Sequence, residues 1–270
     1  MSAHRVTLRG MVEIGAHLHE GDPLTEARAR QADLVQIFLG DPQGFKAPPD
    51  RSAEAAALAE AGIGYYVHAP YLVNVATLNN RIRIPSRKLL DQQAAAAAAI
   101  GARGLIVHGG HVNAGDDPEQ GYANWHKVFS RAQESGGFPL PIIIENTAGG
   151  ENAMARRLDR VGRLWDAIGE FDPHFCLDTC HAHAAGEELL DVVDRVKALI
   201  GRIDLVHANG SRDPFGSGAD RHTNFDTGEI DPDAIVAVCL AAGTPVIVET
   251  PGGAEGQGAD IAFLRSRLPH

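Results

Sequence analysis

The sequence has few of the residues that mark secreted, disulfide-bonded or membrane-spanning proteins. It contains three cysteines in 270 residues, too few for a disulfide framework or a four-cysteine zinc site, and this count fits a reducing compartment. No apolar run approaches the roughly 18 residues that a membrane-spanning helix needs, and the opening MSAHRVTLRG lacks the apolar segment of a signal peptide. We therefore expect a cytoplasmic protein that does not enter a membrane.

Positive charge is also scarce. Lys and Arg number 24 against 35 Asp and Glu, which gives a net charge of -11. Proteins that bind nucleic acid usually have a basic surface, so the charge taken alone argues against such a partner. The 44% of hydrophobic residues and 22% of charged residues are ordinary for a globular protein with a sizeable core.

Short apolar runs alternate with helical stretches along the chain. Continuous apolar runs followed by amphipathic helices indicate buried parallel strands, and eight such units predict a (β/α)8 TIM barrel with its active site at the C-terminal ends of the strands. A doubly wound open sheet is the alternative. We predict one barrel domain over residues 11–270, after a flexible N-terminal tail over residues 1–10. The predicted strands lie at residues 13–18, 34–38, 65–70, 104–109, 141–146, 175–180, 203–209 and 245–250, and helical stretches include 52–62, 86–102, 152–169, 188–201 and 231–243.

Six consecutive predicted strands end in a side chain that can bind a metal. Each has three mostly apolar residues before that side chain, and the C-terminal ends of barrel strands meet at one mouth. A lone His there is more often structural, and a lone Asp or Glu often caps the next helix. Several carboxylates in one mouth would repel one another unless cations neutralised them, and mixed imidazole and carboxylate suits Zn²⁺, Mn²⁺ or Fe²⁺. More than one ion is implied by the six residues His68, His108, Glu145, Asp178, His207 and Glu249.

Three further candidates lie just beyond the strands. His181 follows Asp178 by three residues and is expected on the turn after the strand, and Asp220 and His222 share a long loop. An Asp-x-His pair on an irregular segment can present both side chains to one ion; a mobile surface loop is the alternative. Cys176 and Cys180 are expected to pack rather than to bind metal.

Six segments resemble the signature blocks of a known family. VHAPYLVNVAT, LIVHGGH, IENTAGG, CLDTCHAHAAG, FGSGADRHTNFDTGEI and IVETPGG are similar, in sequence and order, to blocks of the endonuclease IV family of apurinic/apyrimidinic endonucleases, also called deoxyribonuclease IV or AP endonuclease family 2. The resemblance implies a barrel with three zinc ions, with manganese or iron possible at some positions. It implies His68, His108 and Glu145 on the first ion; Glu145, as a bridge, with Asp178, His207 and Glu249 on the second; and His181, Asp220 and His222 on the third.

The same resemblance implies an activity in DNA repair. The substrate would be double-stranded DNA containing an abasic site, cut on the 5′ side of that site to leave a 3′-hydroxyl and a 5′-deoxyribose phosphate. The nucleophile would be a hydroxide that bridges two metals beside Glu145. Removal of blocked 3′ ends and a monomeric protein are also implied.

DNA contacts are less explicit in the sequence. Tyr71 matches the tyrosine of a loop that the family wedges into the duplex, although a buried ring is the alternative. The second wedge loop offers Gln43, Phe45 and Lys46, where relatives can have an arginine. Arg221 lies between two proposed ligands and is a reasonable phosphate contact. Three divalent ions would add positive charge at this face, which softens the objection from net charge.

Two other functions fit parts of the pattern. A metal-dependent sugar isomerase or epimerase on the same barrel would use His, Asp and Glu at strand ends. However, such an enzyme would not need the Asp220–His222 pair. It usually needs a proton-transfer group such as Lys, and none of the six strands ends in Lys. A noncatalytic protein that binds damaged DNA or stores metal would not need nine intact ligands.

Overall fold

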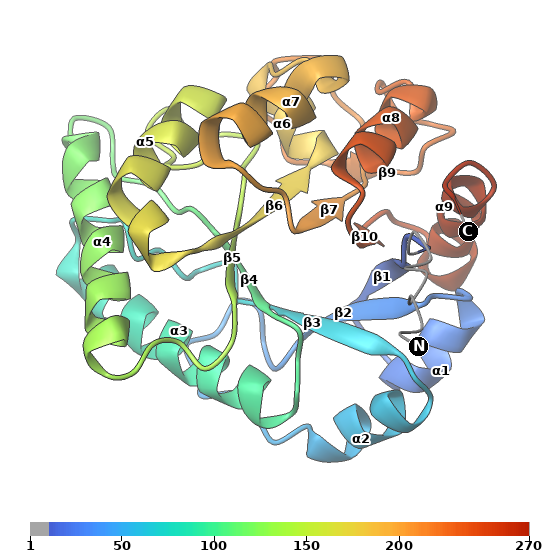
Figure 1. Ribbon diagram of the computed structural model, residues 1–270, viewed down its shortest axis with the longest axis horizontal. Coiled ribbons are helices and arrows are strands. Elements are labelled where there is room, and N and C mark those ends of the chain that lie inside the picture. The colour runs from blue at the N-terminus through green and yellow to red at the C-terminus, as the bar shows by residue number, and fades with distance from the viewer. Residues whose placement is uncertain (1–10, 270) are drawn as a thin grey trace, which may run out of the picture.

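Eight parallel strands close into a barrel, as the sequence predicts (Figure 1). The computed structural model describes residues 11–269, so the predicted tail over residues 1–10 lies outside the described residues. Hydrogen bonding joins the last barrel strand to the first, which makes the open-sheet alternative wrong. The barrel order is β1 (Ile14–Leu18), β10 (Val246–Val248), β7 (Leu205–His207), β6 (His174–Asp178), β5 (Ile142–Glu145), β4 (Leu105–His108), β3 (Gly64–His68) and β2 (Leu34–Phe38).

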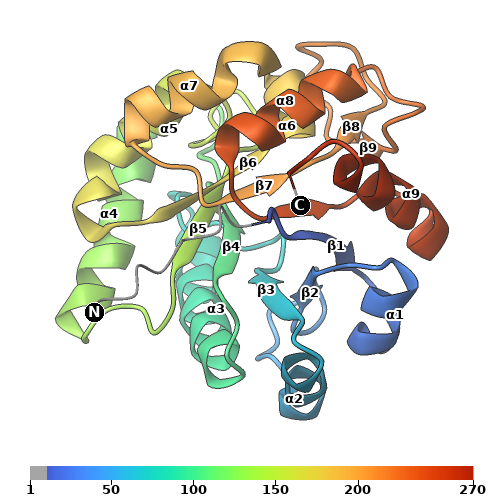
Figure 2. The same ribbon diagram turned by 45° about the vertical axis from the view of Figure 1, so that its right-hand side comes forward.

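Helices surround the barrel and cover the outer faces of its strands (Figures 1 and 2). None of the helices within residues 11–269 combines the length and the apolar character that crossing a membrane requires. The helices are α1 (Pro23–Ala29), α2 (Ser52–Glu60), α3 (Asn80–Ala99), α4 (Pro118–Glu134), α5 (Leu158–Ile168) with the short η1 (Gly169–Phe171), α6 (Thr179–Ala185), α7 (Leu189–Ile200), α8 (Pro232–Ala242) and α9 (Gly253–Arg265).

Two helices begin at places that the sequence pattern does not indicate. The helix expected from Ser86 begins at Asn80, because the side chain of Asn79 accepts a hydrogen bond from the backbone N–H of Arg81 and caps it. The helix expected from residue 152 begins only at Leu158. The residues before it are held by other loops, since Met154 donates its backbone N–H to Gly110.

The strands alternate between two apolar environments. Outward-facing residues pack against the helices in one large core, whereas a second, smaller cluster is built from one residue of each strand except β1. At the corresponding position β1 has Gly15, where a Cβ atom would lie 1.9 Å from the backbone oxygen of Leu34. Because side chains two residues apart share a face of a strand, the residue two positions after each member of this cluster points into the barrel mouth. The smaller cluster consists of Leu34, Tyr66, Ile106, Ile143, Cys176, Leu205 and Ile247.

The longest loop at the barrel mouth follows β7 and is anchored to the body of the protein. It contains a two-stranded antiparallel ladder, β8 (Gly210–Ser211) with β9 (His222–Thr223). The backbone N–H groups of Gly216 and Gly218 donate to the carbonyls of His183 and Ala184 at the end of α6. The alternative of a mobile surface segment does not fit these contacts.

Candidate metal centre

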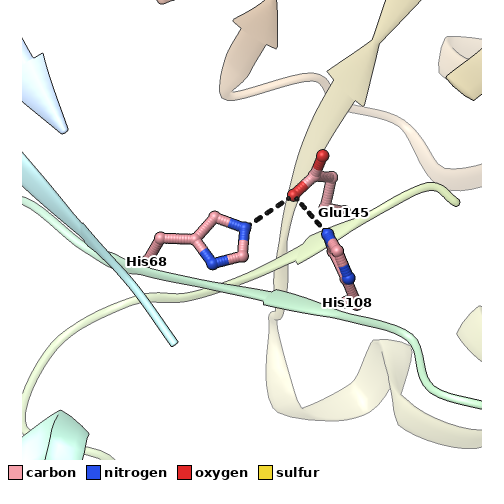
Figure 3. A group of neighbouring side chains, drawn as sticks. All are labelled: His68, His108 and Glu145. Atoms are coloured by element: carbon pink, nitrogen blue, oxygen red, sulfur yellow. Dashed lines mark hydrogen bonds and ion pairs between the residues drawn. The ribbon is translucent and has the colours of Figure 1, made fainter. Parts of the chain in front are cut away.

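Three side chains from adjacent strands converge at the barrel mouth. His68, His108 and Glu145 end β3, β4 and β5, and both imidazoles point to the same carboxylate oxygen (Figure 3). The Nε2 atoms of His68 and His108 lie 3.1 and 3.3 Å from Oε2 of Glu145. Ligand atoms placed tetrahedrally at about 2.1 Å from a zinc ion are about 3.4 Å apart. The spacing therefore fits donors that share one ion.

A second group uses the other oxygen of the same carboxylate. Oε1 of Glu145 lies 3.2 Å from Nδ1 of His207. That ring nitrogen is also 3.3 Å from Oε2 of Glu249 and 3.9 Å from Oδ2 of Asp178. Candidate ligand atoms of all four residues lie within 4.8 Å of one another, so Glu145 belongs to both groups and can bridge them.

The third group joins α6 to the loop after β7. Nε2 of His181 and Nε2 of His222 lie 3.1 and 3.3 Å from Oδ1 of Asp220. Both nitrogens are buried, yet neither makes a hydrogen bond with proper geometry to any residue within the described range 11–269. Buried polar atoms rarely lack partners. Two imidazole nitrogens that face the same space beside a carboxylate are therefore better explained by a bound cation than by contacts within the protein.

The second ring nitrogen of each buried histidine in the three groups has a partner on the protein. Nδ1 of His68 is 2.7 Å from the carbonyl of Ala69, and Nδ1 of His181 is 2.8 Å from the carbonyl of Asn146. A carbonyl only accepts hydrogen bonds, so in the neutral ring these Nδ1 atoms carry the proton. Nε2 then has a free lone pair with which it can bind a metal. His207 is reversed: its Nε2 is held 2.8 Å from Gln36, and Nδ1 faces the carboxylates.

The electrostatics of the cluster favour added positive charge. Burial opposes ionisation of Glu145, yet His207 and His108 hold the pKa of this carboxyl well below its usual range. Burial also opposes protonation of His181, but Asp178 and Asp220 hold its pKa well above the usual range. Glu145 thus retains its charge beside protonated imidazoles, whereas burial raises the pKa of Asp178. Divalent cations would stabilise the charged form of both carboxylates. The donor set fits the implied metals.

Two asparagines that the sequence reasoning missed hold the ligands in place. Asn146 accepts from the backbone N–H of Asp178 at 2.7 Å and donates to its carbonyl at 3.0 Å. Asn209 donates to Oδ2 of Asp178 at 2.6 Å and accepts from the backbone N–H of Glu249 at 2.8 Å. Their position one or two residues after a strand-end ligand was the available signal.

His181 lies in a different element from the one expected. It is in the first turn of α6 rather than on a turn, because Asp178 caps this helix by accepting the N–H of His181 at 2.7 Å. Asp178 therefore combines the capping role and the role in the cluster. His17 contacts Glu249, with 3.1 Å between Nδ1 and Oε1, whereas the exposed His111 belongs to none of the three groups.

The cysteines do not alter this arrangement. Cys176 packs in the inner barrel cluster. Cys180 lies near Asp178 and His222 and could geometrically form a fourth group with them. Burial raises the pKa of Cys180 to about 12, so its thiol is protonated at neutral pH and is a poor ligand.

The predicted DNA-contact residues lie around the mouth with different exposures. Tyr71 is 49% exposed and lines a cavity of about 250 Å³ together with His68, His108, Asp220 and other residues of the centre. The alternative of a buried ring is therefore wrong. The neighbouring loop contains Gln43, Phe45 and Lys46. The backbone N–H of Tyr71 donates to the carbonyl of Pro42 in this loop. Arg221 is exposed.

Arg221 has a partner within the protein. Its guanidinium forms two hydrogen bonds to the carboxylate of Asp213, one of them 2.8 Å long. Asp213 in turn accepts, through its backbone carbonyl, from Nε2 of His183 at 3.0 Å. His183 and Arg221 thus help to fix the loop of Asp220 and His222.

Comparisons with known proteins agree with this arrangement. The family model described as "Xylose isomerase-like TIM barrel" matches residues 24–267. A protein of Mycobacterium bovis (strain BCG / Pasteur 1173P2), called "Probable endonuclease 4", is 56% identical over 254 residues, which is 94% of this chain and 98% of that protein. The chain belongs to the endonuclease IV family.

Solved structures give the same result. The endonuclease IV of Thermus thermophilus matches with a TM-score of 0.79 and 28% identity over 94% of this chain and 98% of that one. A D-tagatose 3-epimerase-like protein matches almost as well, with a TM-score of 0.78, but at only 14% identity over 95% of this chain and 97% of that one. This second likeness reflects the shared barrel alone and leaves the membership of the endonuclease IV family unchanged.

Proposed function

We propose that this protein is a metal-dependent DNA repair endonuclease that hydrolyses the phosphodiester bond on the 5′ side of an abasic site in duplex DNA. The observation that carries the proposal is the set of three adjoining groups of His, Asp and Glu at one barrel mouth, the first two of which share Glu145. The relatives called endonuclease 4, at 56% identity, support the same conclusion. We expect three zinc ions, with Mn²⁺ or Fe²⁺ possible at one or more positions.

The chain's residues divide the work of holding these ions. His68 and His108 would share the first with Glu145, which would also contribute to the second beside Asp178, His207 and Glu249; His181, Asp220 and His222 would hold the third. When bound, divalent cations lower the pKa of water and neutralise charge on a phosphate. The backbone acceptors and asparagines described above keep the donor atoms aimed at the mouth, so little reorganisation is needed when substrate arrives.

The protein's own side chains would select the abasic site. A nucleotide without a base has little stacking to lose, so turning it out of the duplex costs less than turning out an intact one. Tyr71, half-exposed beside His108, would stack where that nucleotide was, and its ring packs edge-on against Phe38 at 5.1 Å between ring centroids. Phe45, Gln43 and Lys46 would contact the same stretch of DNA.

The products follow from the position of the cut. Hydrolysis on the 5′ side of the abasic sugar leaves a 3′-hydroxyl and a 5′-deoxyribose phosphate. A phosphate or phosphodiester that blocks a damaged 3′ end presents the same kind of bond to the same mouth, so we expect removal of such groups as well. We expect the protein to act as a monomer.

A sugar isomerase or epimerase is the competing proposal because such enzymes share the barrel. The eight side chains that line the cavity at the centre include no lysine to transfer a proton, and Asp220 and His222 would have no task in sugar chemistry. We therefore favour the nuclease.

Incubation with a duplex that contains one abasic site tests the proposal. We expect incision 5′ to that site with metal and none with chelator. Glu145→Ala should lower the rate more than about 100-fold, beyond the 10- to 100-fold effect of losing an outer partner of a metal ligand. Glu60→Ala, at an exposed position on α2, is the matched control and should cut normally. Failure of the metal-replete wild-type protein to cut would refute the proposal.

A further inference from the structure

One fully buried amide lies in the same layer as the candidate ligands. Gln36 is on β2, two residues after Leu34 of the inner barrel cluster, and has no solvent exposure. Its side chain contacts His207 and Glu249, both in the second group. We propose that Gln36 is a positioning residue that fixes which nitrogen of His207 and which oxygen of Glu249 face the second ion.

The amide matches His207 and Glu249 in only one orientation, and in that orientation its Nε2 also lies 2.5 Å from Nδ1 of His17. Oε1 lies 2.8 Å from Nε2 of His207, and Nε2 donates to Oε1 of Glu249 at 2.7 Å. Turning the amide over would place its oxygen against the carboxylate oxygen, which cannot donate. The oxygen therefore faces His207 and requires a proton on Nε2 of that ring. Nδ1 is left with a lone pair directed at the carboxylates.

Gln36 has the same effect on Glu249. Its donated hydrogen bond occupies Oε1, and His17 covers the same oxygen with Nδ1 at 3.1 Å. Oε2 is the oxygen that lies 3.3 Å from Nδ1 of His207. Gln36 thus directs ligand atoms from two strands to one point, with His17 assisting at Glu249.

His207 depends on a side chain where its neighbours depend on backbone. His68 and His181 have their second nitrogens on the carbonyls of Ala69 and Asn146, which substitution does not remove. Gln36 can be removed by mutation without altering a predicted ligand. A charged replacement would add to the carboxylates already present, so a neutral amide is the side chain that can both accept and donate here.

The inference rests on the proposed metal centre but not on cleavage of DNA, so Co²⁺ binding is the appropriate measurement. Wild-type protein, Gln36→Met and Gln36→Asn are stripped of metal and titrated with Co²⁺, with binding followed by calorimetry and by the visible absorption of the ion. Met keeps the volume without the hydrogen bonds, whereas Asn keeps the amide but is one methylene too short. Gln93→Met is the matched control, because Gln93 is a buried glutamine on α3 whose Oε1 has no partner in the described part of the chain.

We expect both Gln36 variants to bind one class of Co²⁺ roughly 10- to 100-fold more weakly, with altered absorption, while the other ions and the metal-free melting temperature of Gln36→Asn stay close to wild type. Gln93→Met should bind like wild type. Wild-type affinity for every ion in a folded Gln36 variant would overturn the inference, and so would an equal weakening of all ions. Absence of Co²⁺ binding by the wild-type protein would overturn the metal centre itself.

Discussion

Removing divalent metal should destabilise the fold by a measurable amount. Glu145 and Asp178 are fully buried at the barrel mouth, and no hydrogen-bond partner within residues 11–269 satisfies Nε2 of His181 or His222. An ion that binds the folded state at 100 times its Kd contributes about 2.7 kcal/mol. In a domain of this size about 1 kcal/mol corresponds to roughly 2–4 °C in melting temperature. Each ion removed should therefore lower the Tm by roughly 5–10 °C.

The loss should grow as pH rises. In the metal-free protein, burial opposes protonation of His181 and His207, but nearby acidic groups hold both pKa values well above the usual 6.5. A group with a raised pKa in the folded state stabilises the protein fully below its unfolded pKa and loses that contribution as pH rises through the folded pKa. Protons therefore compensate for missing cations near pH 6 and no longer do so at higher pH.

Differential scanning calorimetry with and without chelator, between pH 6 and pH 9, measures both effects. Metal content before and after treatment confirms removal, and added Zn²⁺ should restore the original Tm. A metal-free protein that melts within about 2 °C of the loaded one at all these pH values would refute the reasoning. A gap that narrows with rising pH would refute the part that concerns His181 and His207.

Three further outcomes are expected. Tyr71→Ala should weaken binding of an abasic duplex about 10- to 100-fold in a fluorescence anisotropy titration, because stacking of one base is worth about 1–3 kcal/mol; Glu60→Ala on α2 is the control and should bind normally, and equal losses in the two variants would contradict a stacking role. Gly15→Ala should lower the free energy of unfolding by about 1–3 kcal/mol or more, since its Cβ would lie 1.9 Å from the backbone oxygen of Leu34; an unchanged urea midpoint would show that the strands can separate freely. With a net charge of -11, DNA affinity should fall only gently with salt, and a slope of log K against log salt of about -5 or steeper would contradict this.

The strand pattern predicts both the barrel and the ligands at the strand ends, because both follow from the two-residue periodicity of a β-strand. In β7, Leu205 belongs to the inner apolar cluster and His207, two residues later, reaches the mouth. The same arrangement in β2 places Leu34 and Gln36, and the segments Asp-Leu-Val-His and Asp-Leu-Val-Gln are nearly identical. A search for residue types that bind metal misses Gln36, because glutamine is not one of those types. Gln36 nevertheless lies in the same layer as the ligands and orients two of them.

Features that depend on loops are less accessible from the sequence. The position of Arg221 between two predicted ligands suggests a DNA contact, but its charge is matched by Asp213, eight residues earlier in the same loop. A pairing of this kind is decided by how the loop folds back along α6, and residue type or spacing does not specify it. Residue type and spacing likewise do not indicate that His181 lies in a helix, which begins there because Asp178 caps it.

The inner apolar cluster of the barrel has a kinetic consequence. It lies beneath the candidate ligands, between them and the opposite end of the barrel, so ions, water and DNA would all reach them from the mouth. Once a duplex covered the mouth, a bound ion would exchange with solvent more slowly than in the free protein. The protein would therefore hold its metal most securely during the interval in which it is engaged with damage, and would be most vulnerable to competing chelators while it searches.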